Sequence, residues 1–160
     1  MTSARPLPFP ATLQAPGTQD APFEAVVKLV DLPMGALLRV SRGDLDVLIA
    51  HCEAGIAATE DRCPHMSAPL SVGQLEGCVI HCPLHRGAFD LRYGEVVTFP
   101  TTGGLDAEGE PRPAWTPEGT DARPQPADSK ARARALTRVR RLRYFPLRIR
   151  EGDVEIALPR

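Results

Sequence analysis

The chain of 160 residues has few aromatic side chains and no long apolar run. One Trp, two Tyr and five Phe stand beside 17 prolines and 13 glycines, a balance that disfavours a helical bundle and favours turn-rich β structure. The longest apolar stretches, at 34–38 and 47–50, are far shorter than the roughly 20 residues that a membrane-spanning helix needs. We therefore expect one domain of ordinary size, with appendages and without a membrane anchor.

The chain also lacks a strong net charge and a secretory signal. Its 19 Lys and Arg residues nearly balance its 20 Asp and Glu residues, which removes the field expected of a general nucleic-acid or membrane-surface binder. Residues 1–22 contain five prolines and no continuous apolar segment, so we expect a disordered Pro-rich tail. The default location is the cytoplasm, where four cysteines more often include metal ligands than form a disulfide framework.

Alternating apolar and polar residues, interrupted by turn signals, run through much of the remaining chain. Residues 23–60 predict short strands and hairpins, and residues 147–158 predict a closing hairpin. An insert at about 102–141 begins with a Pro- and Gly-rich stretch in which a packed element is not expected. The expected fold class is all-β, a domain of small antiparallel sheets over residues 23–160 that this insert interrupts.

Positive charge is concentrated near the C-terminus. Residues 1–128 carry nine cations and seventeen anions, whereas residues 129–160 carry ten cations and three anions. The basic run 130–150 is interpreted either as a docking surface for an acidic redox partner or as a solvated face.

A short basic amphipathic helix is predicted inside this run. Asp128 and Ser129 are both suitable N-caps for the sequence KARARALTRVRRLR. Within it, Leu136, Val139 and Leu142 are spaced three residues apart, as on one face of a helix.

Two short motifs combine cysteine, proline and histidine. The chain reads Cys-Pro-His at 63–65 and, after sixteen residues, Cys-Pro-Leu-His at 82–85, so each motif supplies one sulfur and one nitrogen. Zinc fingers generally take two cysteines from one turn and two histidines from another, whereas mixed pairs favour two metals a few Å apart. A single zinc ion remains the alternative, since Cys₂His₂ is also a zinc donor set. The prolines restrict φ beside the ligands and so help to fix their directions.

The segment CPHMSAPLSVGQLEGCVIHCPLHRGAFDLRYG resembles the cluster-binding segment of Rieske-type [2Fe–2S] ferredoxins. The resemblance implies the Rieske fold and one [2Fe–2S] cluster, with Cys63 and Cys82 on the inner iron and His65 and His85 on the outer iron near the surface. Because two neutral imidazoles replace two thiolates, the potential is expected well above the value of about −400 mV that is typical of all-cysteine ferredoxins.

Departures from the family pattern refine this expectation. Ala68 and Leu84 stand where respiratory and photosynthetic Rieske proteins have the cysteines of a loop disulfide, so that bridge is not expected. Gly87 and Phe89 stand where those proteins present hydroxyl donors to the cluster, which predicts a potential toward the lower end of the Rieske range. Arg86 occupies the place after the second histidine where a glycine is frequent, which predicts a slightly different loop register.

The remaining cysteines and histidines are not expected to bind metal. In a reducing compartment, Cys52 and Cys78 are predicted to be buried free thiols. His51 and His81 are each adjacent to a cysteine, but strand alternation turns His81 away from its neighbours, and neither is a ligand candidate.

The function implied by the resemblance is that of a soluble one-electron carrier, which passes electrons from a reductase to a terminal oxidoreductase such as a ring-hydroxylating oxygenase. The chain itself is not expected to be an oxygenase, because only 75 residues follow His85 and no second 2-His-1-carboxylate iron site is apparent. One alternative is the small Rieske-like subunit of an assimilatory nitrite reductase. Another is a redox sensor whose basic run contacts nucleic acid, although neither nucleic acid nor a membrane is an expected partner.

Overall fold

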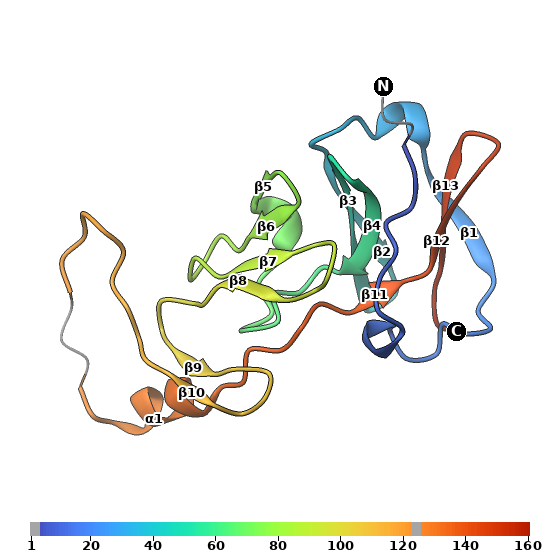
Figure 1. Ribbon diagram of the computed structural model, residues 1–160. Helices are drawn as coiled ribbons and strands as arrows, with labels where there is room; N and C mark the ends of the chain where they lie inside the picture. Colours follow the sequence, from blue (N-terminus) through green and yellow to red (C-terminus); the bar gives the residue numbers. More distant parts are fainter. Residues whose placement is uncertain (1–3, 123–125) are drawn as a thin grey trace.

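The computed structural model describes residues 4–122 and 126–160. Most regular elements are short antiparallel strands, which confirms the all-β fold class (Figure 1). No described helix is long and apolar enough to cross a membrane.

Two sheets form the base of the domain. One has the strand order β11-β4-β3-β2 and is built from β2 (Leu37–Arg42), β3 (Leu45–Cys52), β4 (Gly55–Glu60) and β11 (Tyr144–Phe145). The other has the order β1-β13-β12 and is built from β1 (Phe23–Lys28), β12 (Leu147–Arg150) and β13 (Asp153–Ala157). The expected closing hairpin is therefore present as β12 and β13. The short 3₁₀ turn η2 (Leu29–Asp31) follows β1.

The central strand β3 is buried on both faces. Val47 and Ile49 belong to the core between the two base sheets. Leu48 and Ala50 point the opposite way, into a second core beneath the loop-rich half of the chain. Because one strand contributes to both cores, the two halves of the domain are packed against each other.

The loop-rich half carries a third sheet of order β5-β6-β7-β8. Its strands are β5 (Gln74–Glu76), β6 (Val79–His81), β7 (Ala88–Asp90) and β8 (Val96–Thr98), preceded by the 3₁₀ turn η3 (Leu70–Val72). Two loops remain outside the strands, at 61–69 before η3 and at 82–87 between β6 and β7. The first loop contains the Cys-Pro-His motif and the second contains the Cys-Pro-Leu-His motif.

The insert contains more structure than expected. It holds β9 (Gly104–Leu105) and β10 (Pro111–Arg112), which pair with each other, and the helix α1 (Ser129–Leu136). After α1 the chain returns to β9, where the Leu105 amide donates to the Thr137 carbonyl at 2.9 Å. The Trp115 indole donates to the Phe99 carbonyl at 2.7 Å and so ties the insert to the segment after β8.

The basic helix is confirmed, but its predicted apolar face is wrong. The Asp128 carboxylate accepts a hydrogen bond from the Ala131 amide and is the N-cap. The helix ends at Leu136, whose side chain is 68% exposed. Val139 and Leu142 lie in the extended segment that follows the helix, and both are buried. They are therefore buried by tertiary packing and not because they share one face of a helix.

The N-terminal segment packs onto the base, so the expectation of a disordered tail is wrong for residues 4–22. The Leu7 amide donates to the Ile56 carbonyl at 2.7 Å, and the Ala15 amide donates to the Tyr144 carbonyl at 2.7 Å, with η1 (Ala11–Leu13) between them. Leu7 and Ala15 are themselves buried. Prolines suit an extended segment along a sheet edge because few of its amides need partners there. Residues 1–3 lie outside the described residues.

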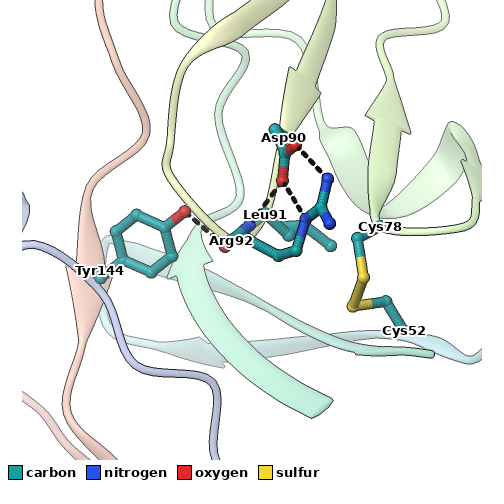
Figure 2. Close-up of a disulfide and its surroundings, with 6 residues drawn as sticks. All are labelled: Cys52, Cys78, Asp90, Leu91, Arg92 and Tyr144. Carbon is teal, nitrogen blue, oxygen red and sulfur yellow. Dashed lines mark hydrogen bonds and ion pairs between the residues drawn. A yellow bond between two sulfur atoms is a disulfide. The ribbon is translucent and has the colours of Figure 1, made fainter. Parts of the chain in front are cut away.

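A disulfide joins the two halves of the domain, so the prediction of two free thiols is wrong. Figure 2 shows Cys52, the last residue of β3, bonded to Cys78, which lies in the turn before β6. Their Cα atoms are 5.1 Å apart. Strand alternation places Cys52 on the same face as Leu48 and Ala50, and this face meets the third sheet.

Candidate metal centre

The two motif loops have the same backbone pattern. In the first, the Cys63 amide donates to the Ala68 carbonyl at 2.7 Å, five residues ahead. In the second, the Cys82 amide donates to the Gly87 carbonyl at 2.7 Å, with the same spacing. Each loop is thus closed at its base, and the ligand residues between lie on a tight turn.

Both loops reverse direction at a residue in the left-handed region. Ser67 has a φ of 62° and Arg86 a φ of 60°, and each is the fifth residue counted from the cysteine of its motif. Arg86 therefore takes the conformation that a glycine adopts without strain, at a cost of about 1 kcal/mol. Gly87 is not in that region, and a Cβ added there would lie 3.3 Å from the Pro100 side chain. The second loop thus repeats the geometry of the first and accepts strain at Arg86.

The two motif sulfurs form a buried pair. Cys63 and Cys82 are 4% and 5% exposed. A hydrogen bond to the Cys82 sulfur, and next burial, raise the pKa of the Cys63 thiol well above its usual range. The same hydrogen bond is the main cause that lowers the pKa of Cys82 to about 6. Backbone amides also donate to the sulfurs, from His65 and Met66 to Cys63 and from Leu84 and His85 to Cys82. These donors favour thiolate at both positions.

The two motif imidazoles form a second pair. The ring centroids of His65 and His85 are 5.1 Å apart, with the rings edge to face. Burial, and next the charge of His85, lower the pKa of His65 to about 4, so its ring is neutral near pH 7. The Nδ1 atom of His65 is buried and has no hydrogen-bond partner among the described residues. Its other nitrogen, Nε2, lies 3.1 Å from the Thr102 hydroxyl.

A buried carboxylate holds the first loop in place. The Asp61 side chain is fully buried, two residues before Cys63. It accepts hydrogen bonds from the Ser71 amide at 2.7 Å, from the Ser71 hydroxyl at 2.5 Å and from the Arg39 guanidinium at 3.0 Å. These bonds join the two ends of the loop. The two motifs did not predict that Asp61 holds the loop, although the sequence shows an acidic residue two positions before Cys63.

The structure brings the four predicted ligands together as a sulfur pair and an imidazole pair. Among the described residues, no three His, Cys, Asp or Glu side chains converge around one point as a single-ion site needs. The other two histidines lie elsewhere. His51 Nδ1 is 2.8 Å from the Leu32 carbonyl, and His81 Nε2 is 3.4 Å from a Glu76 carboxylate oxygen.

Comparisons with known proteins agree on one family. The family model described as the Rieske [2Fe-2S] domain matches residues 23–108. The ferredoxin component of the naphthalene 1,2-dioxygenase system of Pseudomonas putida is 40% identical over 76 residues, which cover 48% of this chain and 73% of that protein. The ferredoxin subunit of the 3-phenylpropionate/cinnamic acid dioxygenase of Photorhabdus laumondii is 35% identical over 78 residues, which cover 48% of this chain and 73% of that protein.

Solved structures give the same result. A chain from the complex of reduced oxygenase and oxidized ferredoxin in carbazole 1,9a-dioxygenase superposes with a TM-score of 0.57 and 26% identity. The match covers 86% of this chain and 94% of the other.

Proposed function

Since the chain belongs to the Rieske [2Fe-2S] domain family, we propose that Cys63 and Cys82 bind the inner iron of its [2Fe–2S] cluster and that His65 and His85 bind the outer iron. The buried Nδ1 atom of His65 supports this assignment, because a buried nitrogen without a partner is costly unless a metal takes its lone pair. The amides that donate to the two sulfurs also fit, since such donors stabilise cluster ligands.

The chain is an electron carrier, and its cluster takes up and releases one electron at a time. We propose that it carries electrons from a reductase to the terminal oxygenase of a ring-hydroxylating system. The observation that carries this proposal is the asymmetry of the site, with both sulfurs buried and His85 partly exposed beside Leu84, which is 63% exposed. An imidazole edge that reaches the surface shortens the distance to a partner's redox centre.

The two histidines outside the site do not form an oxygenase centre with the other described residues. His51 contacts the Leu32 carbonyl, and His81 lies beside Glu76, so these two histidines do not face each other across a shared site. The relatives of the chain are ferredoxin components of dioxygenase systems, so we propose that the oxygen chemistry belongs to its partner.

Anaerobic purification with analysis of iron and sulfide tests the assignment. We expect two irons and two sulfides per chain, a Rieske-type optical and EPR spectrum, and a midpoint potential well above −400 mV but not clearly positive at pH 7. His65→Ala should abolish the spectrum, while the matched variant His81→Ala should keep it. Colourless protein that carries zinc after supply of iron and sulfide would overturn the assignment.

We also propose a cytoplasmic location, as expected from the sequence. The Cys52–Cys78 disulfide is unusual for that compartment, because its thiol pools keep such bonds rare in most organisms. Cell fractionation should recover the carrier together with cytoplasmic marker proteins. Recovery outside the cytoplasmic fraction would contradict this location.

A further inference from the structure

Arginine side chains line a groove directly over the first ligand loop. The groove has a volume of about 400 Å³, and its walls include Cys63 and His65. Five arginines line it, namely Arg62, Arg138, Arg140, Arg141 and Arg143, together with one carboxylate, that of Glu60. We call these five residues the arginine groove. Four of its five arginines come from the segment after α1, which is distant in sequence from the loop.

Backbone hydrogen bonds fix this segment against the ligand loop. The Arg140 amide donates to the Pro64 carbonyl at 3.2 Å, between the two motif ligands. Three residues later, the Glu60 amide donates to the Arg143 carbonyl at 2.9 Å. In Figure 1 the segment runs from α1 back toward β11 along the underside of the third sheet. The arginine groove is therefore a fixed feature of the ligand loop and not a free tail.

Burial of the intervening apolar residues directs the arginines outward. Val139 and Leu142 are 0% and 1% exposed, whereas Arg138, Arg140 and Arg143 are exposed. The three-residue spacing that failed as a helix face thus anchors an extended segment at Val139 and Leu142, with these three arginines in solvent.

Several of these cations have no carboxylate of their own. Arg141 forms an ion pair with Glu108. Arg138 and Arg143 donate only to the carbonyls of Ala107 and Thr12 in the described part of the chain, at 3.4 and 3.3 Å. Since no described carboxylate lies within 4 Å of Arg138, Arg140 or Arg143, these guanidinium groups are available for an external carboxylate. Arginine is suited to this role because its planar fork binds carboxylates through two parallel hydrogen bonds.

We propose that the arginine groove is the docking surface for an acidic protein surface of an electron-transfer partner. This rests on the proposed function, since the groove wall includes His65, a proposed ligand of the outer iron. Although His65 is buried, its ring centroid lies 5.1 Å from that of the partly exposed His85, so a partner docked there lies close to the same imidazole pair. A row of guanidinium groups along an extended segment matches a row of carboxylates on a protein better than it matches one phosphate. Docking at this groove brings the partner beside the outer-iron ligand, and the positive charge accelerates encounter. The cations of α1 lie away from the ligand loop and take no part.

Two double variants with the same change of total charge separate the effect of charge in the groove from the effect of net charge. Arg140→Glu with Arg143→Glu changes the groove, and Lys130→Glu with Arg132→Glu changes α1 by the same total charge. The probe is reduced flavodoxin, an acidic one-electron donor, mixed with the oxidised cluster-loaded protein in a stopped-flow instrument over a series of salt concentrations. The parent rate constant should fall as salt rises. The groove pair should lower the low-salt rate at least tenfold and remove the salt dependence, while the α1 pair should change the rate less than twofold.

Equal losses in the two variants, or a parent rate that is independent of salt, would overturn the proposal. So would binding of random duplex DNA at 150 mM salt that the groove pair abolishes while leaving the flavodoxin rate unchanged. The EPR spectrum of each variant and its reduction by dithionite are recorded first. A missing cluster in the parent refutes the proposed function, whereas an intact cluster without the local charge effect refutes the docking surface alone.

Discussion

The Cys52–Cys78 disulfide encloses the first ligand loop, and removing it should lower the stability of the domain. The two cysteines are 26 residues apart, and the segment between them contains Asp61, Cys63 and His65. Both half-cystines are buried, at 1% and 4% exposure, and they join the base to the third sheet. The bond therefore restricts the part of the unfolded chain that carries the first pair of proposed ligands.

The expected loss follows from the length of the enclosed segment. A cross-link over 26 residues removes chain entropy from the unfolded state that corresponds to about 3.5 kcal/mol at 25 °C. For a chain of 160 residues, each kcal/mol shifts the melting temperature by about 2–4 °C. Cys52→Ala should therefore lower the melting temperature of the cluster-loaded protein by about 7–14 °C.

Differential scanning calorimetry of the parent, Cys52→Ala, Cys78→Ala and the double variant provides the measurement, with one scan rate for all. Either single substitution breaks the same bond, so the double variant should melt close to the single variants. If the decreases in melting temperature of the two single variants added up in the double variant, the substitutions would have removed side-chain packing and not a shared bond. Alkylation of the denatured parent without reductant should label two of its four cysteines. Labelling of all four, or a shift below about 2 °C, would refute the cross-link as a source of stability.

Three further substitutions test single contacts. Arg86→Gly relieves the left-handed backbone and should raise stability by about 1 kcal/mol, so a lower melting temperature would contradict strain there. Asp61→Asn weakens the bonds to Ser71 and should cost about 1–3 kcal/mol, with faster loss of iron to a chelator; unchanged iron release would refute its role in holding the loop. Tyr144→Phe removes the hydroxyl that donates to the Leu91 carbonyl, drawn in Figure 2, and should cost about 1 kcal/mol at pH 7. Because burial raises the pKa of Tyr144 in the folded state, urea unfolding of the parent should show stability falling as the pH rises above about 10, and the variant should lose less over that range.

Short-range patterns predicted the elements that depend on neighbouring residues. The turn at 151–153 determines the hairpin of β12 and β13, and the Asp128 side chain determines where α1 begins, since it caps an amide three residues ahead. The ligand types and their spacing are likewise local, because each motif places a cysteine and a histidine on one tight turn. The four candidate ligands were therefore recognisable before any fold was known.

The wrong predictions of two free thiols and of a disordered tail both concern contacts between residues that are distant in sequence. Nothing near Cys52 indicates that its partner is Cys78, because that pairing depends on how β3 meets the third sheet. Composition alone predicts disorder for the Pro-rich N-terminal segment. The segment is nevertheless packed, because the Leu7 amide can donate to the Ile56 carbonyl at the edge of β4.

The sequence by itself determined the proposed ligand set of this protein, namely two sulfurs, two imidazoles and the turns that present them, because these rest on residue type and short spacing. The tertiary structure decided what surrounds that chemistry. Burial left the His65 Nδ1 atom without a partner, and the return of the chain after α1 placed Arg140 against the ligand loop. Such features depend on which distant segments pack together, and packing is set by the whole apolar core rather than by any local pattern.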